Sequence, residues 1–173
     1  MTNFKEDLLR VKAFVFDIDG VLSLQTISLN TFGVPNRTVN LRDGYALQLA
    51  VKKGYYVGVI SGANSKEYLR RLKSLGIKDI YLNSRKKTDH FLDFLSRHKL
   101  DKSDVLYMGD DIPDYEVMKM AGIPVCPSDA DSEIRQISLY VSDKKGGQGC
   151  VRDVVEQVLR LHNNWLGSDA FTW

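Results

Sequence analysis

The chain has 173 residues, of which 43% are hydrophobic and 10% aromatic, enough for one domain with an ordinary core and too many for a disordered chain. The 24 Lys and Arg residues against 22 Asp and Glu give a formal net charge of +2, which argues against nucleic acid or an anionic membrane as the main partner. The N-terminus lacks the apolar core of a signal peptide and no apolar run is long enough to cross a bilayer, so we expect a cytoplasmic protein. Cys126 and Cys150 lack metal-ligand spacing and are expected to be free core thiols.

Apolar runs alternate with amphipathic stretches along the chain. The apolar runs predict strands at 11–16, 55–60, 80–82, 105–108, 123–126 and 139–141. The stretches between them predict helices at 44–53, 65–75, 88–98, 113–120 and 151–162. This order is typical of an α/β fold, a Rossmann-like three-layer sandwich with a parallel sheet, here as one domain over 1–173.

Residues 23–41 interrupt this alternation. Scattered β-formers surround a Gly33-Val34-Pro35-Asn36 turn signal, which predicts a β-hairpin inserted after the first strand. The segment is too short for a cap domain. A hairpin alone is marginal in water, so we expect its apolar residues to pair with another subunit, the alternative being that it folds onto its own domain.

Two C-terminal features carry weaker signals. The tail at 163–173 holds Trp165, Phe171 and Trp173 but follows no helical pattern, so it is expected to be disordered, or else to dock into a neighbouring subunit's site. The glycine run at 146–149 has no following Lys and Ser or Thr, so it is not a P-loop and is expected to form a supporting turn before the last helix.

The strongest signal is Asp17-Ile18-Asp19-Gly20, directly after the first apolar run. Side chains two apart on an extended backbone point the same way, so both carboxylates would lie beyond the strand's carboxyl end, where open α/β sheets bind ligands. Two such charges repel each other unless a cation such as Mg²⁺ lies between them. The alternative is a solvated turn.

Other strand ends carry chemistry of the same kind. Ser61-Gly62 follows one strand, Gly109-Asp110-Asp111 with Asp114 follows another, and Lys87 precedes a helix. Carboxylates, a hydroxyl and an ammonium together are what phosphoryl transfer requires. Taken singly, Ser61 is also a plausible helix cap, Lys87 a solvated charge, and Asp111 and Asp114 acids favoured in a first helical turn.

In these motifs the chain resembles the haloacid dehalogenase-like hydrolases over nearly its whole length. The resemblance implies that Asp17 is the nucleophile and Asp19 the general acid and base, while Ser61 and Lys87 hold the phosphate. It further implies Mg²⁺ held by Asp17, the backbone carbonyl of Asp19, and Asp110, with two supporting carboxylates, Asp111 and Asp114.

Within that family, the missing cap and the inserted hairpin resemble small tetrameric phosphatases of 3-deoxy sugar acids, in which a neighbouring subunit completes each active site. This implies a phosphorylated eight-carbon keto-sugar acid as substrate, in lipopolysaccharide synthesis. Ala63 stands where relatives carry Arg or Glu, so a nine-carbon 9-phosphate is the alternative. The implied substrate contacts are weaker assignments, at Gly20, Asn40, Arg42, Asp43, Gly62 and Ala63.

Two alternatives belong to other classes. A signalling receiver module also combines acids, a hydroxyl and a lysine, but its phosphate-accepting Asp follows a middle strand, whereas Asp17 follows the first strand here. An inactive assembly scaffold is disfavoured because Asp19, the acid and base needed for turnover, is retained.

Overall fold

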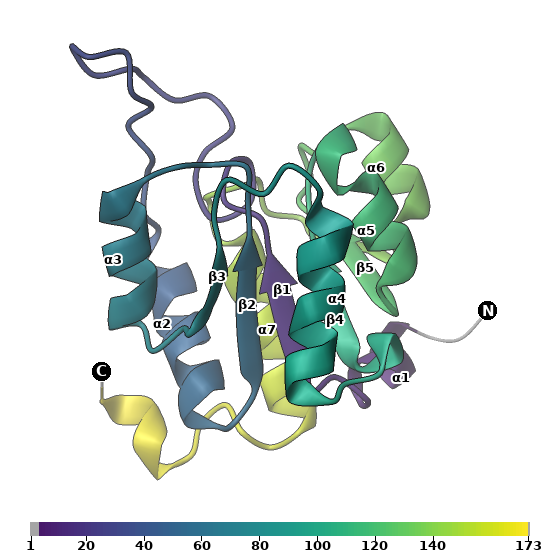
Figure 1. Cartoon of the computed structure of the whole chain (residues 1–173). Helices are drawn as coiled ribbons and strands as arrows, with labels where there is room; N and C mark the ends of the chain where they lie inside the picture. Colours follow the sequence, from purple (N-terminus) through teal and green to yellow (C-terminus); the bar gives the residue numbers. More distant parts are fainter. Residues whose placement is uncertain (1–3, 173) are drawn as a thin grey trace.

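A parallel sheet forms the centre of the computed structural model, which describes residues 4–172 (Figure 1). Its order is β3-β2-β1-β4-β5-β6, and every neighbouring pair of strands is parallel. The strands are β1 (Ala13–Phe16), β2 (Tyr56–Ile60), β3 (Asp79–Tyr81), β4 (Val105–Met108), β5 (Ile123–Cys126) and β6 (Tyr140–Val141). The chain adds β2 and β3 on one side of β1 and then returns to add β4 on the other. Open parallel sheets bind ligands at the carboxyl ends of strands beside such a reversal.

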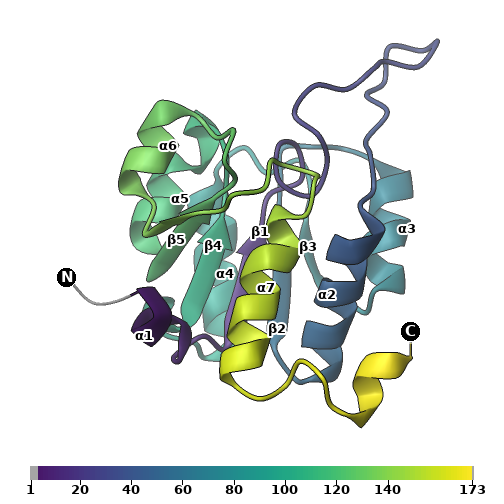
Figure 2. The same ribbon diagram turned by 180° about the vertical axis from the view of Figure 1, so that it is seen from behind.

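Helices cover both faces of this sheet, as the sequence predicts (Figure 2). One face carries α1 (Phe4–Leu8), α2 (Leu41–Lys52), α3 (Lys66–Ser74) and α7 (Cys150–Leu161), and the other carries α4 (Lys87–His98), α5 (Tyr115–Met120) and α6 (Ser132–Ile137). The central strands β1 and β4 are buried along their whole length because helices cover both of their faces. Cys126 and Cys150 are buried and unpaired, as predicted. Within residues 4–172 every helix is too short or too polar to traverse a lipid bilayer.

The sequence analysis missed two helices and placed the ends of others a few residues away. Helices α1 and α6 have five and six residues, too few to show a repeating apolar period. Helix α2 begins at Leu41 rather than at 44, because Asn40 accepts hydrogen bonds from the first backbone N–H groups and so starts the helix earlier.

Residues 24–40, called the projecting loop below, extend away from the sandwich (Figure 1). The chain reverses direction here as predicted, and the N–H of Asn30 donates to the carbonyl oxygen of Val34. However, Leu29 and Pro35 form a single antiparallel bridge, and the loop contains no strand. The expected two-stranded hairpin is therefore a loop in the single chain, because its arms have no third strand or sheet surface to pack on.

The C-terminal tail folds back onto its own chain, which corrects the expectation of disorder. Trp165 is 5% exposed, and the guanidinium groups of Arg152 and Arg160 lie over its ring. A short helix, η3 (Ser168–Phe171), follows, and the hydroxyl of Tyr45 in α2 donates to the carbonyl oxygen of Ala170. Trp173 lies outside the described residues. The apolar ring of Trp165 packs against side chains of α2 and α7, and this contact orders a segment with no periodicity of its own.

Candidate functional site

The turn after β1 places Asp17 at the centre of the sheet edge. The N–H of Asp17 still donates to the carbonyl oxygen of Met108, so the strand pairing continues up to this residue. The chain then turns at Gly20, where φ is +80°. A Cβ on Gly20 would lie only 1.9 Å from Oδ2 of Asp110, so a side chain at this position would displace that carboxylate. Gly20 therefore leaves free the space that the Asp110 carboxylate occupies.

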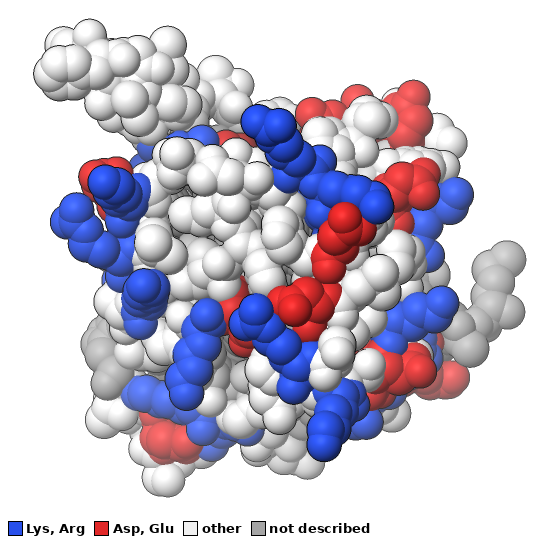
Figure 3. Space-filling view, in the orientation of Figure 1, with Lys and Arg blue, Asp and Glu red and all other residues white. Residues whose placement is uncertain are grey.

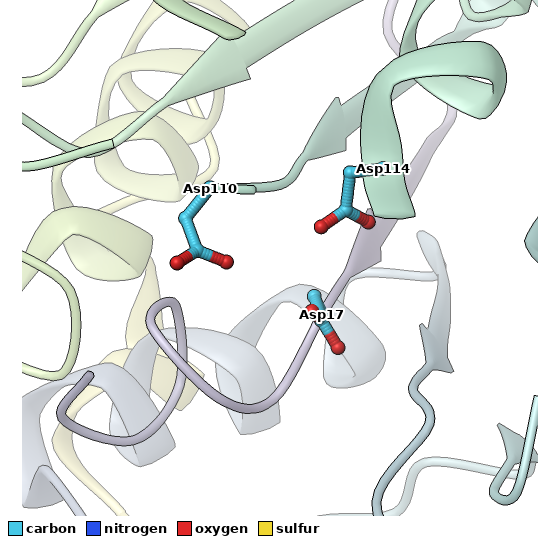
Figure 4. A group of neighbouring side chains, drawn as sticks. All are labelled: Asp17, Asp110 and Asp114. Atoms are coloured by element: carbon cyan, nitrogen blue, oxygen red, sulfur yellow. The ribbon is translucent and has the colours of Figure 1, made fainter. Parts of the chain in front are cut away.

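Three carboxylates converge at this edge of the sheet (Figure 4). Asp17 follows β1, whereas Asp110 and Asp114 follow β4, the strand next to it. One oxygen from each lies within 4.8 Å of the others, and all three residues are buried. The structure therefore brings together the acidic motifs that the sequence places after separate strands.

Lys87, the first residue of α4, reaches two of the three carboxylates. Its Nζ lies 2.8 Å from Oδ2 of Asp17 and 2.7 Å from Oδ1 of Asp114. Burial by itself lowers the pKa of Lys87, but the charges of Asp17 and Asp114 outweigh this effect and raise the pKa. The hydroxyl of Tyr107, fully buried in β4, donates to the same Asp114 oxygen at 2.8 Å. The Lys87 side chain is thus kept protonated, and its hydrogen bond to Asp114 fixes its position.

One ammonium group does not balance three buried carboxylates. Burial, followed by the charges of Asp17 and Asp114, raises the pKa of Asp110 to about 8. Burial and Asp17 raise the pKa of Asp114 as well, although Lys87 opposes them. Oδ2 of Asp114 is buried without a hydrogen-bond partner among the described residues. An excess of negative charge and a free carboxylate oxygen match the needs of a hard divalent cation such as Mg²⁺.

These groups line a cavity of about 450 Å³, called the aspartate cavity below. Nine of the residues that the sequence singles out line it together, namely Asp17, Asp19, Ser61, Gly62, Ala63, Lys87, Asp110, Asp111 and Asp114. Ser61 directly follows β2 and is buried, and its N–H donates to the carbonyl oxygen of Tyr81, which keeps the hydroxyl at the strand end. Oδ1 of Asp111 accepts the N–H of Ile112 and so starts the helical turn that carries Asp114.

The cavity also contains residues that the sequence analysis missed, namely Gln25, Ser84 and Pro113. The amide Nε2 of Gln25 lies 3.4 Å from Oδ2 of Asp110. Arg37 was missed as well, although both of its guanidinium contacts go to Asp19, at 2.8 Å each. The available signal was that Arg37 is the only charged residue between 23 and 41.

Asn40, Arg42 and Asp43 do not line the aspartate cavity in this chain, contrary to the expected substrate contacts. Asn40 caps α2 and its amide donates to the carbonyl oxygen of Gly147. Oδ1 of Asp43 accepts the N–H of Arg152 at 2.7 Å, in the first turn of α7. Arg42 lies on a separate groove with Arg152. The side-chain oxygens of Asn40 and Asp43 therefore accept hydrogen bonds from N–H groups at the N-termini of α2 and α7.

The glycine run at 146–149 supports the turn after β1, in keeping with the supporting role expected for it. A Cβ on Gly146 would lie 1.9 Å from the carbonyl oxygen of Gly20, and the N–H of Gly147 donates to the carbonyl oxygen of Val21 at 2.7 Å. The run therefore packs against the aspartate turn and does not line the aspartate cavity.

Comparison with known proteins agrees with this geometry. Residues 38–127 match the model of the family described as haloacid dehalogenase-like hydrolase. The 3-deoxy-D-manno-octulosonate 8-phosphate phosphatase KdsC of Escherichia coli K12 is 32% identical over 149 residues, which cover 86% of this chain and 79% of that protein. The chain belongs to the haloacid dehalogenase-like hydrolases. The protein of the same name from Yersinia pestis is 30% identical, over 94% of this chain and 87% of its own length.

Solved structures of this hydrolase family have the same fold. The phosphatase of the same name from Moraxella catarrhalis, in complex with magnesium ion, phosphate ion and a KDO molecule, superposes with a TM-score of 0.88 at 30% identity. The match covers 93% of this chain and 92% of that one. The Yersinia pestis phosphatase gives a TM-score of 0.89 at 28% identity, over 93% and 87% of the two chains. This hydrolase is therefore a phosphoric monoester hydrolase with Mg²⁺ as its cofactor. The signalling-receiver alternative is excluded.

Proposed function

We propose that this hydrolase releases inorganic phosphate from 3-deoxy-D-manno-octulosonate 8-phosphate. The relatives that match over most of the chain carry this substrate in their names. The observation that carries the proposal is that Asp17, Lys87 and the two β4 aspartates meet in one cavity that Asp19 also lines. Such a set provides a nucleophile, a phosphate-binding cation, cation ligands, and a second carboxylate for proton transfer.

In the proposed reaction, a carboxylate oxygen of Asp17 attacks the phosphorus atom while the bond to the sugar oxygen breaks. Asp19 gives a proton to the departing sugar oxygen, which leaves an aspartyl phosphate on Asp17. Asp19 then takes a proton from a water molecule that attacks the same phosphorus atom. The water oxygen leaves with the phosphate, and Asp17 is restored. Ser61 and Lys87 hold the phosphate oxygens through both steps.

Asp17, the backbone carbonyl of Asp19, and Asp110 would hold the Mg²⁺ ion, which supplies positive charge beside the phosphate oxygens. Asp111 and Asp114 support this arrangement. The structure favours an anchoring role for Asp114, since its Oδ1 accepts hydrogen bonds from both Lys87 and Tyr107. A fixed Asp114 keeps the ammonium group of Lys87 directed at Asp17.

The substrate site is proposed to be completed by a second copy of the chain. The aspartate cavity is open and its wall at Ala63 has no charged side chain, so one chain offers little to bind a sugar acid. The projecting loop has large exposed apolar side chains, which supports pairing with the loops of other copies in a homotetramer. A product of this kind would enter lipopolysaccharide synthesis.

Phosphate release with Mg²⁺ from the eight-carbon 8-phosphate and from a nine-carbon keto-sugar acid 9-phosphate tests this proposal. We expect a kcat/KM at least about tenfold higher for the eight-carbon ester, since the loss of a few substrate contacts is worth about one to three kcal/mol. Preference for the nine-carbon ester would keep the chemistry and reject the substrate. Release from neither ester would reject the proposed function.

A further inference from the structure

Arg37 forms a two-point ion pair with Asp19. Its Nε and one terminal nitrogen lie 2.8 Å from the two carboxylate oxygens. The arginine side chain is 9% exposed, whereas the Asp19 side chain is 42% exposed. Paired, parallel contacts of this kind fix the plane of a carboxylate as well as its position.

The base of the projecting loop holds Arg37 in place. The next residue, Thr38, is bonded to the turn after β1 in both directions: its N–H donates to Oγ of Ser23, and its Oγ1 accepts the N–H of Leu24, both at 2.9 Å. Ser23 is fully buried. Because Ser23 also lies in the turn that follows Asp19, Arg37 and Asp19 are held on two segments that are themselves bonded together.

The Asp19 carboxylate depends on this contact for its orientation. Among residues 4–172, no side chain other than Arg37 forms a hydrogen bond with it. A half-exposed aspartate without such a contact would sample several rotamers. Proton transfer to a leaving oxygen requires the carboxylate within hydrogen-bond reach of that oxygen, so an unrestrained side chain would be correctly placed for only part of the time.

We infer that Arg37 is a positioning residue, which holds the Asp19 carboxylate in the orientation needed for proton transfer and so ties the projecting loop to catalysis. The inference rests on the proposed function, because it requires Asp19 to be the acid and base. Arg37 could instead bind an anionic group of the substrate directly, and the test below separates these two roles.

The test compares Arg37→Met and Arg37→Lys with wild type, using an alkyl sugar phosphate and p-nitrophenyl phosphate. The nitrophenolate leaves without help from an acid, so the first step should form the aspartyl phosphate at nearly the wild-type rate and give a burst of nitrophenol. The following turnover needs Asp19 as base. We expect Arg37→Met to keep the burst and to slow steady-state turnover of both esters by about 10- to 100-fold. For p-nitrophenyl phosphate KM should fall together with kcat, so that kcat/KM stays close to the wild-type value.

Arg37→Lys keeps the charge but loses the two-point contact, so it should recover only part of the lost rate. The matched control is Arg97→Met, which removes an arginine bonded at 2.8 Å to Asp93 in α4, on an outer surface of the domain. It should turn over like wild type. Thermal unfolding of each variant identifies any loss of folded protein.

The decisive comparison adds Arg37→Met to Asp19→Asn. If Arg37 acts only through Asp19, the double variant is no slower than Asp19→Asn alone, because the two losses are not additive. A further drop of the same factor in the double variant, or wild-type turnover in Arg37→Met, would overturn the inference while the proposed function stands. Absence of Mg²⁺-dependent phosphate release by wild type from either ester would overturn both.

Discussion

Asp17 and Asp19 stand two residues apart in one motif, but their surroundings differ. Asp17 is 7% exposed and is paired with Lys87, whereas the half-exposed Asp19 is paired with Arg37 from the projecting loop. Carboxylates in different environments can perform different tasks in one reaction. These different surroundings support Asp17 as the nucleophile and Asp19 as the group that transfers the proton.

Replacing Asp17 by Asn tests the nucleophile. The amide has the same shape, so the fold should persist, but it lacks the charged oxygen that attacks phosphorus. We expect kcat to fall by about 10³-fold or more, measured as phosphate release. Unfolding in urea and far-ultraviolet circular dichroism serve as controls for the fold. An Asp17→Asn variant with substantial turnover would show that another group takes the phosphoryl group.

Asp43 makes a separate prediction about stability. Burial, the largest cause, raises its pKa from 3.8 to about 6, and hydrogen bonds from the backbone of Arg152 and Gly149 only partly oppose this. Between these two values the folded chain keeps a proton that the unfolded chain has lost. Folding stability therefore falls as pH rises through this window, by about 3 kcal/mol, because a tenfold change in an acid dissociation constant corresponds to about 1.4 kcal/mol.

The variant Asp43→Asn removes this titration and still offers an oxygen to the N–H of Arg152. Urea unfolding at pH 4 and pH 7, with a chelator present, should show that the variant gains about 2 kcal/mol relative to wild type at the higher pH, since pH 4 already lies near the unfolded pKa. Any constant cost of the substitution cancels in this comparison. A difference between the two proteins that does not change with pH would contradict the account.

At the scale of elements, the buried strands could be predicted and the loops could not. β4 and β5 begin and end at the residues expected, because strands covered on both faces are continuous apolar runs. The site could be predicted as far as its residues lie just beyond such strands, as Asp17, Ser61 and Asp110 do. Arg37 and Gln25 reach Asp19 and Asp110 from an irregular loop, whose path depends on contacts between residues far apart in sequence.

The C-terminal tail provides a prediction at this scale. Trp165→Ala removes a buried ring and its contacts with two arginines, so we expect a loss of about 3 kcal/mol in the free energy of unfolding. Because the tail lies at the opposite end of the sheet from the projecting loop (Figure 1), kcat and KM should be unchanged.

Leu166→Ala is the matched control for this variant, since Leu166 is 68% exposed and should cost less than about 0.5 kcal/mol. A drop in kcat/KM for Trp165→Ala without a drop in stability would instead mean that the tail serves a neighbouring subunit's site.

For the molecule as a whole, the projecting loop is the feature that the single chain leaves unexplained. Figure 3 shows it at the upper left as a white, uncharged extension of a surface that elsewhere carries charges of both signs. Residues 23–36 contain no charged side chain, and Phe32 is 88% exposed. Apolar groups of this size on a protruding loop are typical of an interface between chains. Contacts that form only between copies would cover these apolar side chains, and they lie outside the packing of a single chain.

The double variant Leu29→Ser, Phe32→Ser tests this interface. Sedimentation velocity should show a tetramer for wild type and smaller species for the variant, with kcat/KM reduced about 10- to 100-fold because each site loses its neighbour. The control Leu92→Ser replaces a half-exposed leucine on α4 and should leave both quantities unchanged. The interface would be rejected if the loop variant sedimented like wild type.

The most direct test of the whole account is to find where the phosphoryl group goes. In Asp19→Asn, p-nitrophenyl phosphate should still phosphorylate Asp17, and the missing base should let the aspartyl phosphate accumulate until acid quenching. The account predicts label from the ³²P ester on the peptide that contains Asp17, dependent on Mg²⁺, and no label when Asp17 is also replaced by Asn. Label on another residue, or nitrophenol release at the wild-type rate with no labelled protein, would contradict it.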